Sequence, residues 1–401
     1  MTAGPLPRDE PVRVLLLLSS LHGGGAERVA VHLLNGLDPA RFEVRMGLLR
    51  AAGPYLAEVD RARLVVAPHG DRRFDFDGSN RSQFRPAKLW RGAFDAPRAV
   101  RAMIEEVRPH VVLSFLKGTN LIAWRALAGM GQARPRWIAR EGNNALAVIA
   151  EEAPFPLAAR GIAALTARAY RAADAVLTLS EALGRDLTRD FALDPARVAT
   201  IPNPVDTAAV RAAASERPRD LRERPFVLAA GRLEWQKGHD LLLRAFAASG
   251  AAARRDLVIL GAGSREAELR RLATTLGIAG AVRWAGFQAN PFGWMAACDL
   301  FVLPSRWEGF GLALAEAMAA GAPVLAADCD YGPGEIVRHG EDGWLVAPED
   351  AAALAEALGD LLADQGLRAR LAAAGRRSVE RFALPVVLAR YAALIEDVAA
   401  R

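Results

Sequence analysis

The stretch LPSRWEGFGLALAEAMAAGAP, residues 303–323, decides the fold of the second half of this chain. The apolar run Leu300–Leu303 that leads into it is typical of a short buried strand, and the proline that follows ends that strand. Every residue of Leu312–Ala320 favours a helix, and a glycine and a proline close behind mark the helix end. A strand, a glycine-containing loop and a helix in this order predict the repeating unit of an α/β domain.

The loop of this unit has the features of a ligand site. Gly309 and Gly311 let the backbone pass close to a ligand, which a Cβ would prevent. No Ser, Thr, Asp or Asn stands at the capping position, so the first amides, from Phe310 to Leu312, are predicted to be open to an anion. Glu308 lies in the loop and Glu316 about one turn into the helix. The alternative is an ordinary strand–turn–helix with two solvated glutamates, since helices are often acidic near their start.

A second loop of the same half carries two cations. The predicted strand Phe226–Ala230 runs into GRLEWQKG, in which Arg232 and Lys237 follow the carboxyl end of the strand. A forked guanidinium and a compact ammonium together suit two adjacent phosphates, although a solvated loop is the alternative. Lysine is rare here, since only Lys88, Lys117 and Lys237 occur in the whole chain. Persistence of a lysine in an arginine-rich chain favours a specific role.

Charge is unevenly distributed along the 401 residues. The net charge is +5, and residues 1–205 hold 28 Lys and Arg against 21 Asp and Glu. A basic half suits an anionic membrane, a phosphorylated acceptor or nucleic acid, whereas a general abundance of arginine is the alternative explanation. Aromatic residues make up only 7% of the chain and do not alternate with the arginines, which argues against a nucleic-acid-binding protein.

Cysteine and hydropathy patterns predict the compartment. Cys298 and Cys329 form neither a disulfide framework nor a metal-binding spacing, which favours a reducing environment. The apolar run at residues 12–18 is too short for a membrane span and leads into glycines, so it is predicted to be a strand. We therefore expect a cytoplasmic protein that contacts the inner membrane peripherally.

The order of elements predicts two Rossmann-like α/β domains facing each other across a cleft. Residues 1–205 hold one βα series and residues 206–384 a second, with prolines at 202 and 204 marking a hinge. The amphipathic segment 385–401 is expected to cross back onto the first domain. Residues 70–92 are polar and aperiodic, and they predict a long mobile loop before a helix at residues 97–107. Ligands of open parallel sheets bind at the carboxyl ends of the strands.

Taken together, these motifs resemble those of glycosyltransferase family 4, the retaining, nucleotide-sugar-dependent enzymes of the GT-B fold. The match spans nearly the full length, and its most specific part is the E-x7-E motif from Glu308 to Glu316 within EGFGLALAE. The segments GRLEWQKG and SLHGGGAER support it. The block DCDYGPGEIV, residues 328–337, resembles members that build capsule, O-antigen or lipid-carried glycans in bacteria.

The resemblance implies a role for each matching residue. Glu316 would bind the ribose hydroxyls of the donor nucleotide, and Glu308 the hydroxyls of the transferred sugar. Arg232 and Lys237 would stabilise the diphosphate leaving group. The amides of Gly309, Phe310, Gly311 and Leu312 would contact the same phosphates, Gly23, Gly24 and Gly25 would close over them, and Gly263 and residues 286–290 would line the base pocket. The donor would be a UDP-sugar and the reaction a hexosyl or N-acetylhexosaminyl transfer with retention.

The chain departs from the family where many members place a histidine after the fifth strand of the first domain. Arg140 and Glu141 stand there instead. Glu141 is therefore expected on the reaction side, with Arg140 and Asn143 on the acceptor side. None of the six histidines has a clear claim to the missing position.

Metal binding is not expected, and no cofactor is implied. Two D-x-D strings occur, at residues 75–77 and 328–330, and this motif binds manganese in another glycosyltransferase fold. The first lacks a preceding strand, whereas the basic pair already serves the diphosphate near the second. Two enzymatic alternatives share the architecture, namely a nucleotide-sugar epimerase and a sugar phosphorylase.

Overall fold

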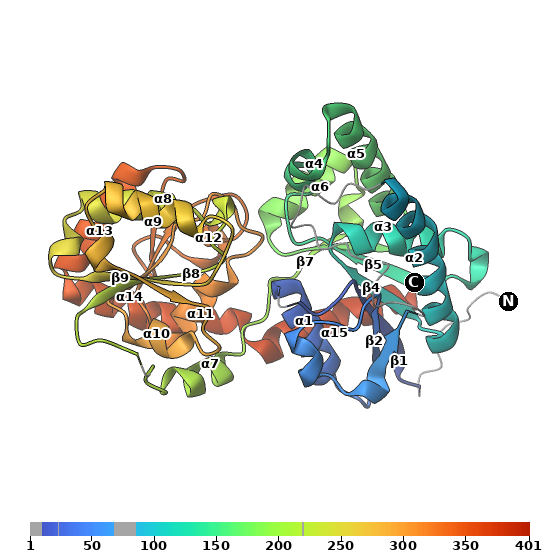
Figure 1. The fold of residues 1–401 in the computed structure, drawn as a ribbon. Helices are drawn as coiled ribbons and strands as arrows, with labels where there is room; N and C mark the ends of the chain where they lie inside the picture. Colours follow the sequence, from blue (N-terminus) through green and yellow to red (C-terminus); the bar gives the residue numbers. More distant parts are fainter. Residues whose placement is uncertain (1–9, 23, 68–85, 219) are drawn as a thin grey trace. The chain divides into compact units, whose positions relative to one another are not determined.

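The computed structural model describes residues 10–22, 24–67, 86–218 and 220–401. The chain divides into two compact units, Met1–Pro202 with Val387–Arg401, and Asn203–Val386 (Figure 1). Each unit is an α/β domain built on a single parallel sheet, as the periodicity of the sequence predicts.

The first unit contains a seven-stranded sheet in the order β3-β2-β1-β4-β5-β6-β7. Its strands are β1 (Val12–Leu18), β2 (Phe42–Leu48), β3 (Leu64–Val66), β4 (Val111–Phe115), β5 (Arg136–Arg140), β6 (Ala175–Thr178) and β7 (Val198–Thr200). All neighbouring strands are parallel. Val14 of β1 pairs with Val44 of β2 on one side and with Val111 of β4 on the other. The central strands are almost continuously apolar because both of their faces are covered.

Helices cover this sheet and place loops at the carboxyl ends of its strands. They are α1 (Gly25–Gly36), α2 (Pro86–Val107), α3 (Lys117–Leu127), α4 (Ala145–Glu152), α5 (Pro156–Arg171), α6 (Glu181–Phe191) and α15 (Leu384–Ala400). Asn144 and Ser180 cap α4 and α6 with their side chains. A capping side chain satisfies one of the amides that a helix start leaves without a partner.

The second helix corrects one expectation. It begins at Pro86 and contains Pro97, whereas the sequence predicted a loop through residue 92 and a helix start at Pro97. A proline inside a helix removes one backbone hydrogen bond, and this helix continues through it. Residues 70–85 of the expected loop lie outside the described residues.

The second unit contains a six-stranded parallel sheet in the order β10-β9-β8-β11-β12-β13. Its strands are β8 (Phe226–Ala230), β9 (Asp256–Leu260), β10 (Val282–Gly286), β11 (Leu300–Leu303), β12 (Val324–Ala327) and β13 (Trp344–Val346). Its helices are α7 (Thr207–Ala214), α8 (His239–Ala248), α9 (Glu266–Thr275), α10 (Phe292–Ala297), α11 (Leu312–Ala320), α12 (Pro333–Ile336), α13 (Ala351–Ala363) and α14 (Gln365–Ser378). Figure 1 shows α8, α9 and α13 on one face of this sheet and α10 and α11 on the other.

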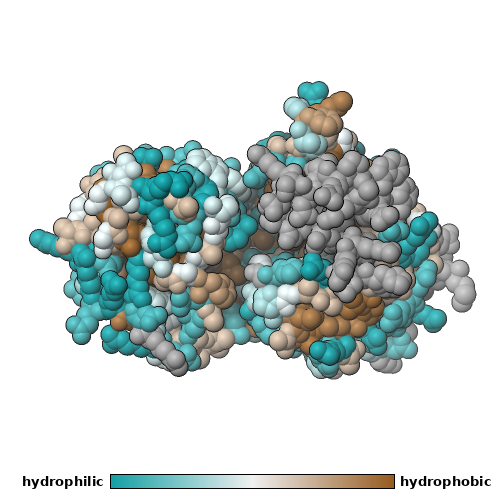
Figure 2. Space-filling view, in the orientation of Figure 1, coloured by the Kyte–Doolittle hydropathy of each residue, from teal (hydrophilic) through white to brown (hydrophobic). Residues whose placement is uncertain are grey.

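Leucine, valine, isoleucine and alanine side chains form the core between this sheet and its helices. Hydrophilic residues make up much of the visible surface of the second unit (Figure 2). No helix in the described part of the chain is long and apolar enough to cross a membrane.

The chain leaves the second unit through α15. Within that unit, Val205 pairs with residues on either side of the helix start, donating to Phe382 O and accepting from Leu384 N, both at 2.8 Å. From Val387 onward α15 belongs to the first unit, where Leu388 lies against Gly36 of α1. Glycine at this position gives the leucine side chain room to approach α1.

Candidate functional site

Three loops of the second unit pack closely at the carboxyl ends of β8, β9 and β11. Gly238 has φ +62°, and a Cβ on it would lie 2.0 Å from the carbonyl oxygen of Pro304. Gly261 has φ +126°, and its Cβ would lie 2.0 Å from the carbonyl oxygen of Gly231. Only glycine combines a positive φ with so close a backbone approach. These two contacts hold the Arg232–Lys237 loop against its neighbours.

Lys237 and Glu308 meet at this edge although 71 residues separate them. The Lys237 Nζ lies 2.6 Å from Glu308 Oε1, and Ser305 Oγ donates to the same oxygen at 2.6 Å. The side chain of Glu308 is 7% exposed and that of Lys237 18%. An ion pair so little exposed is screened weakly by water, so each charge strongly stabilises the other. The structure thus joins two residues that the sequence predicted to serve the sugar and the phosphates separately.

Arg232 is exposed beside this pair. Its Nη2 donates to Gln236 Oε1 at 3.2 Å, and the Gln236 amide in turn donates to the carbonyl oxygen of Trp307 at 3.0 Å. The guanidinium is therefore tied to both the β8–α8 loop and the loop after β11. Arg232 is thus exposed and Lys237 is half-buried, and both lie on the loop between β8 and α8.

The start of α11 has no side-chain cap, as the sequence predicted. Gly311, with φ +94°, is its N-cap, and no side chain caps the helix. Phe310 is 3% exposed and contacts Phe382 edge to face, with ring centroids 5.2 Å apart. Leu312 is the first residue of the helix, and Glu316 is half-buried one turn further along.

The segment after β12 packs against the loop that precedes α11. A Cβ on Gly332 would lie 1.9 Å from the carbonyl oxygen of Phe310, and Glu308 N donates to the carbonyl oxygen of Asp330 at 3.3 Å. Burial raises the pKa of the neighbouring Cys329 thiol to about 12, and the charge of Glu308 adds to the effect. A thiol in this state is not a nucleophile at neutral pH.

Gly263 lies where the β9–α9 loop approaches the loop after β8. Its Cβ would lie 2.5 Å from the carbonyl oxygen of Leu233. Glu234 accepts from Ser264 N at 2.8 Å and from Ser264 Oγ at 2.7 Å. Burial alone would raise the pKa of Glu234, but these hydrogen bonds outweigh it and lower the pKa. The expected base-side glycine is thus part of the same packed edge.

A cluster around Trp235 was missed by the sequence reasoning. Arg306 lies over one ring, with its Cζ 3.4 Å from the centroid, and Arg265 lies 4.6 Å from it. Arg306 binds Asp240 with both of its Nη atoms, at 2.9 and 2.8 Å. Burial opposes ionisation of Asp240, yet the hydrogen bonds and charge of Arg306 lower its pKa. The one signal that could have indicated this cluster is Arg306, the arginine within the stretch 303–323.

His239 is the second residue that the sequence reasoning did not assign. It is the first residue of α8, two positions after Lys237, and is 2% exposed. Burial, with the charge of Lys237, lowers its pKa to about 4, so the ring is neutral at physiological pH. Within the described part of the chain, neither ring nitrogen makes a hydrogen bond of good geometry, and an interaction with the backbone of Arg232 only partly opposes the fall in its pKa.

In the first unit, Gly24 is the N-cap of α1 and Gly25 its first residue. Both are exposed, and no side chain caps this helix, so its start resembles that of α11. Gly23 lies outside the described residues. The uncapped helix start keeps the expected anion-binding role of this loop open to test.

Arg140 and Glu141 are buried at the carboxyl end of β5, 1% and 2% exposed. Glu141 accepts from Tyr170 Oη at 2.5 Å and from the amides of Gly142 and Asn143 at 2.9 and 3.2 Å. Burial raises the pKa of Glu141, while these bonds and the charge of Lys117 oppose the rise. Arg140 Nε donates to Tyr391 Oη of α15 at 2.9 Å. Both side chains are thus held from within the protein, whereas Asn143 is half-buried.

Metal-binding groups are scarce in the described residues, where no cluster of three His, Cys, Asp or Glu could hold an ion. Asp328 and Asp330 are exposed on either side of the buried Cys329. The other D-x-D string, residues 75–77, lies outside the described residues.

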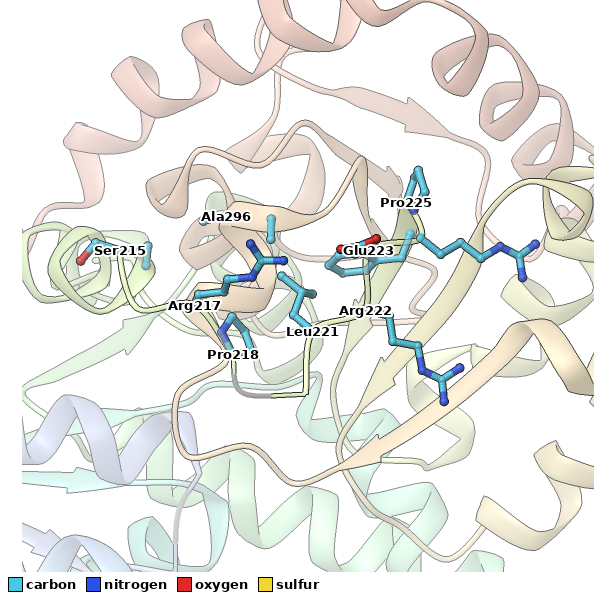
Figure 3. Close-up of a pocket in the computed structure, with 13 residues that line it drawn as sticks. Ser215, Arg217, Pro218, Leu221, Arg222, Glu223, Pro225 and Ala296 are labelled. Atoms are coloured by element: carbon cyan, nitrogen blue, oxygen red, sulfur yellow. The ribbon is translucent and has the colours of Figure 1, made fainter.

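The second unit also contains a cavity of 380 Å³ at the opposite edge of its sheet, where β8 begins. Figure 3 shows Arg217 beside Ala296 there, with the guanidinium of Arg222 pointing away. The residues predicted to bind a donor are not among those lining it. The chemistry of the carboxyl edge therefore marks the better candidate site.

Comparisons with known proteins bear on the family and the fold of this chain. The family model described as Glycosyltransferase Family 4 matches residues 23–209, and the model described as Glycosyl transferases group 1 matches residues 212–378. An exopolysaccharide phosphotransferase of Streptomyces coelicolor is 33% identical over 57% of this chain and 24% of its own length. A Campylobacter jejuni N-acetylgalactosamine-N,N'-diacetylbacillosaminyl-diphospho-undecaprenol 4-alpha-N-acetylgalactosaminyltransferase is 33% identical over 50% of this chain and 53% of its own. The chain thus spans about half or less of the length of these curated relatives.

A solved structure, HepE of Anabaena in complex with UDP, covers 96% of this chain and 100% of its own. It superposes with a TM-score of 0.75 at 20% identity, which supports the fold. The two family models together span most of the chain, one in each unit. The chain therefore belongs to the family 4-like glycosyltransferases, which have the GT-B fold.

Proposed function

We propose that this chain is a retaining glycosyltransferase that moves a hexosyl or N-acetylhexosaminyl group from a UDP-sugar to a glycan or lipid-linked acceptor. The observation that carries the proposal is the Lys237–Glu308 pair, which lies beside Arg232 at the carboxyl edge of the second sheet. The donor's diphosphate and sugar need a cation and a carboxylate at adjacent positions, and this pair supplies both.

Binding of the donor would exchange partners within this pair. Lys237 would turn to a phosphate oxygen, and Glu308 would accept a hydrogen bond from a sugar hydroxyl. Ser305 keeps Glu308 oriented during the exchange, because it binds the same oxygen at 2.6 Å. Arg232 would add a forked contact to the diphosphate, and the open amides at the start of α11 would bind its oxygens. Glu316 would receive the ribose hydroxyls.

The reaction would break the bond between C1 of the sugar and the diphosphate oxygen. Lys237 and Arg232 stabilise the negative charge that develops on the departing diphosphate. The departing phosphate oxygen takes the proton of the acceptor hydroxyl as that hydroxyl attacks the same face of the sugar, so configuration is retained. In this scheme Glu308 holds the sugar and is not a nucleophile. We propose that no metal or cofactor is required.

Residues of the first unit would serve the acceptor side. Gly24 and Gly25 would offer amides to anionic groups at the start of α1. Both oxygens of Glu141 are occupied within the protein, so this residue would act by holding the loop that carries Asn143. Arg140 would support the same loop. Asn143 is the least buried of the three residues.

The names of the relatives and the charge of the first half support the acceptor class. The Campylobacter relative is named for a diphospho-undecaprenol substrate, and residues 1–205 are basic. We propose a lipid-linked or growing glycan as acceptor, with the protein at the inner face of the membrane. An epimerase would act on its donor without such an acceptor, and a phosphorylase would transfer the sugar to inorganic phosphate.

A donor panel tests the proposal directly. Thermal unfolding with UDP, GDP and their sugars should show selective stabilisation by one nucleotide, because a ligand that binds only the folded state raises its stability. Lys237→Met should lower the rate of transfer by about two to three orders of magnitude, as removal of one charge-stabilising donor does elsewhere. Arg271→Met, an exposed change on α9, serves as the matched control.

Product analysis separates this proposal from its alternatives. Nuclear magnetic resonance of the product should show the anomeric configuration of the donor. Turnover of the donor alone to its epimer would favour the epimerase, and dependence on inorganic phosphate would favour the phosphorylase. Failure of every nucleotide to bind would contradict the proposal.

A further inference from the structure

The hairpin of α4 and α5 in the first unit exposes large apolar side chains that the proposed reaction does not use. Phe155, between the two helices, is 56% exposed, and Leu157 and Leu165 of α5 are 72% and 42% exposed. The two leucines are eight residues apart and lie on one side of the helix. Figure 1 shows the hairpin projecting from its unit, and apolar atoms are visible at its tip in Figure 2.

The exposed side of α5 is also basic. The helix contains Arg160, Arg168 and Arg171 and no acidic residue. Within the described part of the chain no carboxylate pairs with Arg160 or Arg168, and Arg168 lies 5.9 Å from the ring centroid of Trp124. The nearest acidic residues along the chain are at the end of α4, where Glu152 is held by Lys117 at 2.6 Å and Glu151 is exposed. Apolar and basic side chains on one helix face are typical of a membrane-surface helix.

We propose that the hairpin surface, formed by Phe155, Leu157, Leu165, Arg160 and Arg168, docks on an anionic lipid bilayer. The apolar side chains would enter the boundary between headgroups and acyl chains, while the arginines reach the phosphates along their flexible stems. This inference rests on the proposed function in one respect, since a lipid-linked acceptor is presented at a bilayer surface.

Charge favours a bilayer over a second copy of the chain. Two copies of α5 meeting face to face would bring their arginines together across the contact, and like charges that face each other weaken an interface. An anionic bilayer pairs each arginine with a phosphate instead. The same surface therefore suits lipid headgroups better than itself.

Vesicle flotation of the full chain, without donor or acceptor, tests the proposal. The protein should float with vesicles of phosphatidylglycerol and phosphatidylcholine, and much less with phosphatidylcholine alone. The double variant Phe155→Ser, Leu157→Ser should reduce the partition coefficient about tenfold, because binding scales with the apolar area inserted. Arg160→Glu with Arg168→Glu should abolish the preference for anionic vesicles. The matched controls are Val66→Ser and Arg61→Glu, which change exposed positions of the same unit outside the hairpin.

Two further measurements make each outcome decisive. Circular dichroism and calorimetry with UDP should show that the variants remain folded and bind nucleotide like the original chain, so loss of vesicle binding is not loss of the proposed function. Equal flotation of the hairpin variants and the controls would overturn the proposal. So would a dimer of the original chain in solution that Leu157→Ser converts to a monomer, since a second copy would then occupy the surface.

Discussion

Glu308 keeps a carboxylate in a nearly buried position because two groups hold one of its oxygens. Lys237 supplies the opposite charge and Ser305 a hydroxyl, each at 2.6 Å from that oxygen. Removing either charge of a buried pair leaves the other without compensation, which costs more than the pair itself contributes. The pair should therefore show strong coupling in stability as well as in donor binding.

A double-mutant cycle measures that coupling. Lys237→Met and Glu308→Gln should each destabilise the second unit, and the double variant should be less destabilised than the sum. The expected coupling is about 1–3 kcal/mol, as for other residues in direct polar contact. Chemical unfolding of the four proteins gives the value. Additive effects would mean that the two residues do not interact in solution.

His239 predicts a dependence of stability on pH. Its pKa is about 4 in the folded chain, against an ordinary value of 6.5, because burial disfavours the charged ring. Between these values the unfolded chain binds the proton and the folded chain does not, so stability falls as the pH drops from about 6.5 to 4. The loss attributable to this residue is about 3 kcal/mol at its greatest, since one pKa unit corresponds to 1.36 kcal/mol.

The variant His239→Leu isolates this effect from other titrating groups. It fills a similar volume without ring nitrogens, so its unfolding free energy should fall less steeply with acidification. It should also be at least as stable at neutral pH, because it removes buried polar atoms that make no hydrogen bond of good geometry. Parallel pH curves for the two proteins would contradict the assigned pKa.

At the scale of elements, the sequence predicts the strands well and the contacts between distant side chains poorly. The strands of the second unit follow from their apolar runs, and the open start of α11 follows from its missing cap. The Lys237–Glu308 contact could not be predicted, because it depends on how two loops 71 residues apart pack against each other. The Arg306–Asp240 pair was missed for the same reason. The predicted start of α2 was wrong because a proline is an ambiguous signal. It is common at a helix start, yet Pro97 lies within this helix.

Packing of the loops predicts a specific effect of Gly238→Ala. The new Cβ would lie 2.0 Å from the carbonyl oxygen of Pro304, so the loops after β8 and β11 would have to separate. Gly250 is a matched control, since its φ of +70° is similar but nothing lies within 4 Å of its Cβ position. Gly250→Ala should cost about 1 kcal/mol for the positive φ alone, and Gly238→Ala clearly more.

The affinity for nucleotide should also fall more in Gly238→Ala than in Gly250→Ala. Gly238→Ala displaces the backbone next to Lys237, so calorimetry should show weaker UDP binding, whereas Gly250→Ala should bind like the original chain. Equal stability and affinity in the two variants would mean that the loops are not in close contact.

At the scale of the whole molecule, the last residues of the chain complete the core of its first unit. Val387, Tyr391, Ile395 and Val398 of α15 are each fully buried, and Tyr391 also accepts from Arg140. The first unit therefore cannot complete its core until the second unit, which precedes α15 in the chain, has been synthesised. Burial of four such side chains contributes about 2 kcal/mol each, which together is comparable to the stability of an entire domain.

Ending the chain after residue 386 should accordingly unfold the first unit and spare the second. Hydrogen exchange should show loss of protection in β1, β4 and β5, while the strands β8, β9 and β11 remain protected, because the core cluster that β8, β9 and β11 form with α8 and α13 contains no residue of the removed segment. Asp397→Ala, an exposed change on the same helix, should leave both units protected. Retained protection of β1 and β4 in the shortened chain would show that α15 is not part of the folding unit, and the burial of its four side chains would then have to be a minor contribution.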